Sequence, residues 1–150
     1  MDSAAIADLI HGAPGFVHLL GPRVVRSSRE EAVLRLDAGP ELHNHLAGPH
    51  AAAIFGLGET AAFVVLLEVF GDLVETGAVP LVKSADIAYS AVATGPLLAT
   101  ARLVDDETAA RAALDERGTA VFGVEVVFTR EDDGRETAVM RPQMALRRPR

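Results

Sequence analysis

The sequence has 150 residues, with no cysteine, no tryptophan and a single tyrosine. Without cysteine, the chain can form no disulfide, no redox-active thiol pair and no cysteine-ligated zinc site. Aromatic residues make up only 5% of the chain although 49% is hydrophobic, so alanine, valine and leucine must supply most of the core. This length and apolar share exclude an intrinsically disordered chain and predict one domain spanning residues 1–150.

Positive charge is also scarce. The formal net charge is −7, and Lys83 is the only lysine among the 14 basic residues. A protein that binds the phosphate backbone of nucleic acid normally carries a basic surface. We therefore expect no nucleic-acid partner.

Neither of the two apolar segments of the chain, residues 1–10 and 51–70, is predicted to enter a membrane. The first ten residues lack a positively charged start, and Asp8 interrupts their apolar stretch, so no secretory signal is expected there. Residues 51–70 contain only two charges, Glu59 and Glu68, but Glu59 lies near the middle, where a charge costs about 2.5–3.5 kcal/mol on insertion. The segment is therefore predicted to be the buried central helix of a cytoplasmic protein, with apolar neighbours on all sides.

Capping residues, turn residues and hydrophobic periodicity predict the order of elements. Pro142 interrupts the last strand and predicts a sheet edge or a bulge there. Because the strands form successive hairpins, the single long apolar helix must cover one face of their sheet. The fold class is therefore α+β, an antiparallel sheet wrapped around a central helix. The predicted helices are 2–11, 49–70 and 107–117, and the predicted strands are 23–27, 32–36, 81–92, 97–104, 119–130 and 135–146.

One segment gathers polar groups within this apolar chain. Asn44 and His50 precede the long helix, and Glu59 follows His50 by nine residues, or two and a half turns. The amides at the start of the helix, near Ala51, have no intrahelical acceptor and can stabilise a developing oxyanion. A carboxylate in a dry setting can serve as base or nucleophile. Together these groups predict an acyl-transfer site.

Each of these residues also has a purely structural interpretation. Glu59 could pair with an arginine, His50 could only cap its helix, and Asn44 could be an ordinary turn residue. His43 and His45 form a His-x-His pair that resembles half of a metal site, but no third ligand is evident at a helpful spacing. No metal site is therefore expected.

Residues 44–59, NHLAGPHAAAIFGLGE, resemble the signature of hotdog-fold thioesterases of the PaaI type. That signature has Asn or Gln, a His six residues later followed by small residues, then a Phe, and an acid nine residues after the His. The element order also matches the hotdog fold, in which an antiparallel sheet wraps a long helix. The sequence is closest to an uncharacterised bacterial branch, in which alanines follow the His.

The resemblance implies an acyl-CoA thioesterase that needs no metal or bound cofactor, since coenzyme A arrives as part of the substrate. Glu59 would be the general base or nucleophile, the Ala51 amide would polarise the carbonyl, and Asn44 and His50 would position the thioester or the water. The site would form between two subunits of a homodimer or of a dimer of dimers, a homotetramer. Many active relatives have Gly where this chain has Ala51.

Further contacts with the substrate are expected around this segment. Gly48, Phe55 and Phe63 are candidates for contact with the acyl thioester, and the depth of its pocket depends on how Phe55, Phe63 and Tyr89 pack. Basic residues for the coenzyme A phosphates would be Lys83 and Arg102, with Arg130, Arg147 and Arg148 as further candidates. A non-catalytic acyl-CoA-binding or regulatory module is the main alternative. A hotdog dehydratase and a domain without a pocket are weaker ones.

Overall fold

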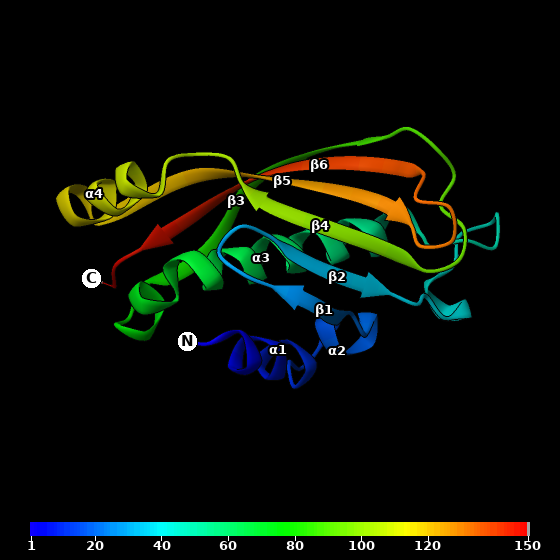
Figure 1. The fold of residues 1–150 in the computed structure, drawn as a ribbon, viewed down its shortest axis with the longest axis horizontal. Coiled ribbons are helices and arrows are strands. Elements are labelled where there is room, and N and C mark those ends of the chain that lie inside the picture. The colour runs from blue at the N-terminus through cyan, green and yellow to red at the C-terminus, as the bar shows by residue number, and fades with distance from the viewer. Residues whose placement is uncertain (150) are drawn as a thin grey trace.

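A computed structural model describes residues 1–149. Its six strands form one antiparallel sheet in the order β1-β2-β4-β5-β6-β3, which curves around the long helix α3 (Figure 1). The predicted α+β arrangement is therefore confirmed. The strands are β1 Arg23–Ser27, β2 Ala32–Leu36, β3 Val79–Tyr89, β4 Leu97–Leu103, β5 Thr119–Arg130 and β6 Glu136–Arg147, and the helices are α1 Ser3–His11, α2 Phe16–Leu20, α3 Ala51–Glu75 and α4 Glu107–Arg117, with a 3-10 turn at Pro40–Leu42.

Small side chains let the sheet approach α3 closely. A Cβ atom on Gly58 would lie 2.6 Å from both Met140 Sδ and Phe128 Cζ, which are themselves fully buried. Within residues 1–149, α3 is the one helix long and apolar enough to cross a membrane, and 78% of its most apolar window is buried inside the molecule. It therefore serves as the core helix. The expected burial on all sides is wrong at Glu59, which is exposed although its neighbours Gly58 and Thr60 are buried.

The ends of α3 differ from the predicted helix 49–70. His50 is the N-cap, with extended backbone, so the helix begins at Ala51. At Phe70, where an end was predicted, the backbone leaves helical geometry (φ −121°, ψ 16°), but the helix resumes and ends at Glu75. Beside this kink the Val69 carbonyl accepts a hydrogen bond from the Arg111 guanidinium at 2.7 Å, which holds the extra turn against α4.

Most other predicted elements are confirmed at or near their ends, and two are corrected. Strand β3 begins two residues earlier and ends three residues earlier than predicted. Pro142 does not lie at a sheet edge, because β6 lies between β5 and β3, and it faces Ala85 of β3. The neighbouring strand accommodates it with a bulge between Val82 and Ser84. Helix α2 was not predicted. It is only five residues long and is closed by Gly21 in the left-handed conformation.

Helices α1 and α2 cover α3 on the side opposite the sheet (Figure 1). Ile6, Ile10 and Leu20 are the buried residues of this layer. The amino terminus is also tied down, since its ammonium lies 2.9 Å from Glu75 at the far end of α3. Exposed Phe16 lies over Gly56, where a Cβ atom would be 2.6 Å from the Phe16 ring. Glycine at this position allows α2 to pack directly on α3.

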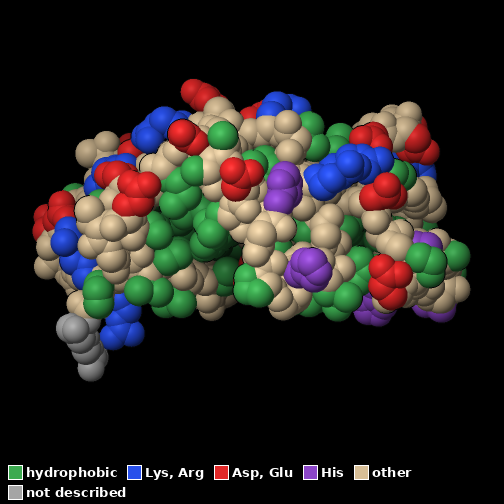
Figure 2. Space-filling model, turned by 90° about the horizontal axis from the view of Figure 1, so that it is seen from below, with side chains coloured by type: hydrophobic (Ala, Val, Ile, Leu, Met, Phe, Trp, Pro, Cys, Tyr) green, Lys and Arg blue, Asp and Glu red, His purple; other side chains and the backbone are tan. Residues whose placement is uncertain are grey.

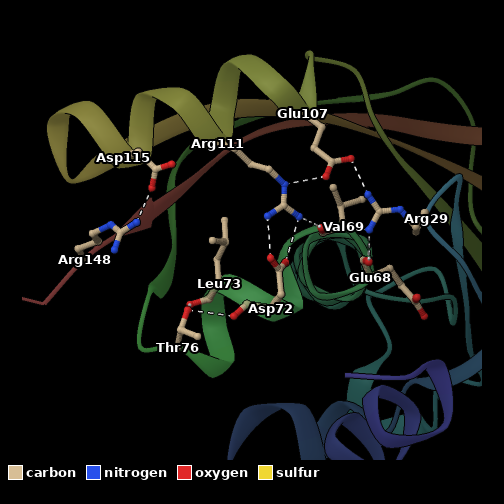
Figure 3. Close-up of polar contacts among 10 residues, drawn as sticks. All are labelled: Arg29, Glu68, Val69, Asp72, Leu73, Thr76, Glu107, Arg111, Asp115 and Arg148. Atoms are coloured by element: carbon tan, nitrogen blue, oxygen red, sulfur yellow. Dashed lines mark hydrogen bonds and ion pairs between the residues drawn. The ribbon is translucent and has the colours of Figure 1, made fainter.

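A network of charges joins α3 to α4 (Figure 3). The Arg111 guanidinium donates to Asp72 at 2.8 and 3.0 Å and to Glu107 at 2.7 Å, and it lies 5.3 Å from the Phe70 ring centroid. Its hydrogen bonds lower the pKa of Asp72. Burial raises the pKa of Glu107, but hydrogen bonds from Arg111 and Arg29 outweigh it, and that pKa is also lowered.

We expect Arg111→Met to lower the free energy of unfolding by about 1–2 kcal/mol at pH 7, because it leaves two partly exposed acids without their cation. The folded pKa values of Asp72 and Glu107 lie below their ordinary values of 3.8 and 4.5. Their contribution is therefore complete above about pH 5 and is lost as the pH falls through the folded values. Urea unfolding at pH 7, 5 and 3 should show the difference from wild type shrinking toward pH 3. Exposed Arg117→Met is the matched control, and an equal loss in that variant would contradict the network.

Candidate functional site

The loop before α3 is held by the side chain that the sequence singled out. Asn44 Oδ1 accepts hydrogen bonds from the amides of Leu46 (2.8 Å) and Gly48 (3.4 Å), and its Nδ2 donates to the Pro49 carbonyl (3.3 Å). This turn also contains Ala47 in the left-handed region (φ 56°), a conformation that costs an alanine about 1–2 kcal/mol. The Asn44 side chain thus stabilises a strained loop. This role is compatible both with an ordinary turn residue and with a residue that positions a substrate.

His50 caps α3. Its Nδ1 accepts a hydrogen bond from the Ala52 amide at 3.0 Å, so in the neutral imidazole the proton is on Nε2. The side chain is exposed, and this Nε2–H is a donor directed away from the cap. The Ala51 amide has no intrahelical acceptor, as at the first position of any helix.

Two further contacts fix the start of α3 against the sheet. The Tyr89 hydroxyl, at the end of β3, donates to the Ala51 carbonyl at 3.1 Å, and partial burial raises the pKa of this phenol. Gly48 approaches the β3–β4 loop so closely that a Cβ atom would lie 2.3 Å from the Ala93 carbonyl oxygen. This close packing explains why position 48 is a glycine. The hydrogen bond from Tyr89 was not predicted, since strand register decides which residue of β3 reaches the helix.

Glu59 lies on the exposed side of α3 at the wall of a pocket of about 670 Å³. Among residues 1–149 no cation lies within ion-pairing distance of its carboxylate, so the interpretation of Glu59 as a structural partner of an arginine is not supported. Figure 2 shows the face that carries α1 and α2, where hydrophobic side chains gather around a hollow. The pocket is lined by Leu9, Ile10, Gly12, Ala13, Pro14, Phe16, Val17, Gly56, Glu59, Thr60, Phe63, Pro80, Leu81, Val82 and Met144.

The predicted substrate contacts are only partly brought together. Phe63 lines the pocket beside Glu59, whereas Phe55 is half-buried and packs against the core instead. Lys83 directly follows three lining residues of β3, Pro80, Leu81 and Val82, but does not itself line the pocket. Arg102 is not brought to the pocket: it lies on the opposite face of the sheet from α3 and is paired with Glu31.

The additional cations are mostly engaged as well. Arg130 bonds Asp133, and Arg148 bonds Asp115, so both guanidiniums already have carboxylate partners. The His-x-His pair is divided, since His43 Nε2 lies 3.1 Å from the Ala38 carbonyl while His45 is exposed. In the described chain, 1–149, no three His, Asp or Glu side chains are grouped as metal ligands. The sequence did not predict that α1 and α2 form a wall of this pocket. The one signal for it was the cluster of apolar residues around Gly12.

Along the helix, Glu59 and the Ala51 amide are eight residues apart, or about 12 Å at the rise of an α-helix. This spacing separates the backbone of Glu59 from the free end of the helix by about two helical turns.

Comparison with known proteins finds one matching family model and several solved structures of similar fold. Residues 6–146 match the family model described as a domain of unknown function, DUF4442. The Pseudomonas aeruginosa protein PA5026, of unknown function and described as a probable thioesterase, is 25% identical, with a TM-score of 0.83 over 98% of this chain and 96% of that one. No curated protein matches the sequence.

Two more distant structures share the fold. The PaaI protein of the Escherichia coli phenylacetic acid degradation operon is 15% identical, with a TM-score of 0.70 over 98% of this chain and 93% of that one. Zebrafish thioesterase superfamily member 2 is 17% identical, with a TM-score of 0.72 over 95% and 96%.

Proposed function

Because the chain belongs to the DUF4442 family and has the hotdog fold of the thioesterase superfamily, we propose that it is an acyl-CoA thioesterase. One observation carries the proposal: Glu59 is an unpaired carboxylate at the wall of an otherwise apolar pocket, on the helix whose free amides face the preceding loop. A carboxylate in this position can activate water or attack a carbonyl. We infer that the protein acts in the cytoplasm and needs no metal or bound cofactor.

The start of α3 supplies the oxyanion donor in this proposal. The Ala51 N–H would donate to the thioester oxygen, and Asn44 and the Nε2–H of His50 would position the thioester or the water. A glycine is required at position 51 only if the backbone is left-handed there. Among residues 1–149 the only non-glycine residue with positive φ is Ala47, so the conformation at Ala51 suits alanine.

A second copy of the chain would bring a free helix end to the Glu59 carboxylate, so that the site forms between the two copies. Strand β3 is an edge of the sheet and is eleven residues long, with exposed Val79, Leu81, Val82 and Tyr89. Long apolar edges of this kind are templates for pairing with another strand. We infer that β3 pairs antiparallel with β3 of the second copy, giving a homodimer and, if the dimers associate, a homotetramer.

This pairing has a consequence for the site. The start of β3, residues 80–82, lines the Glu59 pocket, and its end, at Tyr89, is bonded to Ala51. A two-fold axis near Ser84 sets the start of one strand beside the end of the other. Glu59 of one copy would then face the helix end of the second copy.

Hydrolysis of the thioester would need only Glu59, the Ala51 amide and one water molecule. As general base, Glu59 takes a proton from water while the water oxygen bonds to the carbonyl carbon, and the Ala51 amide stabilises the resulting oxyanion. The carbon–sulfur bond then breaks, and the coenzyme A thiolate takes up the proton. As nucleophile, Glu59 would instead form an anhydride that water opens. Both routes yield a carboxylic acid and free coenzyme A.

The test is release of free thiol from a panel of acyl-CoA thioesters from two to sixteen carbons, including phenylacetyl-CoA. We expect turnover of at least one thioester above a blank without protein. No turnover of any member would refute the catalytic proposal. The alternative, a non-catalytic acyl-CoA-binding protein, is favoured by the Ala51 methyl group at the helix start, and it predicts thermal stabilisation by acyl-CoA without thiol release.

A further inference from the structure

The pocket beside Glu59 has three kinds of wall. Its floor is α3, from Gly56 to Phe63, about 10 Å along the helix axis. One side is β3 at residues 80–82, with Met144 of β6 behind it. The remaining wall is the α1–α2 layer, including the turn at residues 12–15 between the two helices.

The polarity of this pocket limits what it can hold. Of its lining side chains only Glu59 is charged, and the only hydroxyl, that of Thr60, already donates to the Gly56 carbonyl at 2.8 Å. A charged or hydroxylated acyl group would lose its hydration there without gaining a partner. An uncharged hydrocarbon gains by entering.

The size of the pocket argues for more than a small acyl group. A volume of about 670 Å³ lies within the range of pockets that enclose drug-sized ligands, and the floor extends over two helical turns. Six of the fifteen lining residues are Leu, Ile, Val or Met, and only two, Phe16 and Phe63, are aromatic. An extended aliphatic chain fills such a pocket better than a single ring does.

We propose that this pocket holds the hydrocarbon chain of a neutral, medium-length aliphatic acyl group, and that the turn between α1 and α2 limits the length of that chain. The inference rests on the proposed thioesterase function. Ala13 is the residue of the turn best placed to act as the limit, since it is half-buried, lines the pocket and belongs to neither helix. Gly12 and Pro14 flank it, so the turn adds little bulk of its own.

The experiment measures kcat/KM for saturated acyl-CoA thioesters from acetyl to hexadecanoyl, with phenylacetyl-CoA as a separate arm. We expect a rise of about four-fold per methylene up to octanoyl, the value for full burial of each added group. Ala13→Trp should lower kcat/KM for octanoyl-CoA at least ten-fold and leave that for acetyl-CoA nearly unchanged. Ala13→Leu should give a smaller loss in the same direction, and Ala4→Trp, exposed on α1 outside the pocket, should change neither value.

A flat length series, a preference for phenylacetyl-CoA, or an equal effect of Ala13→Trp on all thioesters would overturn the inference. Binding separates this inference from the thioesterase proposal. S-octyl-CoA, a thioether that cannot be hydrolysed, should stabilise the Glu59→Gln variant against heat more than S-ethyl-CoA does, and adding Ala13→Trp should abolish the difference. If turnover is absent but this difference is present, the pocket assignment holds and the thioesterase proposal fails. If turnover is present without this difference, the pocket assignment fails alone.

Discussion

Glu59→Gln is expected to lower kcat for acyl-CoA hydrolysis by about a thousand-fold, within the range for loss of a general base. Glutamine keeps the size and exposure of the side chain but can neither accept the proton of the attacking water nor form an anhydride. Glu59 is exposed and makes no ion pair with any residue of 1–149, so the free energy of unfolding should stay within about 0.5 kcal/mol of wild type. Thiol release and urea unfolding measure the two quantities on the same preparations.

The same helix offers a matched control. Glu68 lies nine residues beyond Glu59, is half-buried, and accepts a hydrogen bond from the Ser27 hydroxyl at 2.5 Å. Glutamine can still accept that bond, so Glu68→Gln should keep kcat within about two-fold of wild type. If Glu59→Gln keeps more than a tenth of wild-type kcat, Glu59 is neither base nor nucleophile.

Mixing two inactive variants is expected to restore activity, because each proposed site takes its carboxylate from one copy and its helix end from the other. Glu59→Gln removes the carboxylate, and Asn44→Ala removes the brace of the loop before α3. In a mixed dimer one site carries both changes and the other carries neither. Unfolding and refolding an equal mixture should therefore yield about a quarter of wild-type kcat, since half of the dimers are mixed and each has one intact site.

The controls for this experiment are the two variants refolded separately, which should each stay near background. Variants tagged differently allow the mixed dimer to be isolated before the assay. Activity of the isolated mixed dimer no greater than that of either parent would show that each site is built within one chain. The axial separation of about 12 Å between the backbones of Ala51 and Glu59 would then be spanned within one chain.

The local features of the fold could be predicted because local residues determine them. Asp106 and Gly118 bound α4 as N-cap and left-handed C-cap, and the sequence places both. The kink at Phe70 could not be predicted in the same way. Beside it, the Val69 carbonyl accepts a hydrogen bond from Arg111, which lies 42 residues away along the chain.

The features of the candidate site also divide into local ones, which could be predicted, and ones that depend on tertiary packing, which could not. The spacing from Asn44 to Glu59 is local, so the loop brace, the His50 cap and the helix start could be predicted. The exposure of Glu59 could not, because it depends on how far α1 and α2 extend over α3. The position of Arg102 away from the pocket has a similar cause: strand alternation leaves it on the outer face, where it pairs with Glu31 of the neighbouring strand end.

The position of the single lysine, Lys83, on β3 has a practical consequence for labelling the protein. Lys83 lies beside Ser84, near the two-fold axis of the proposed pairing, while the other amine of the chain, at Met1, is held by Glu75 at the far end of α3. Chemistry aimed at lysine side chains therefore addresses one point on the molecule, the seam of the proposed β3 pairing. The scarcity of lysine makes that seam a natural position for a fluorophore, a crosslinker or a mass label, without engineering the chain.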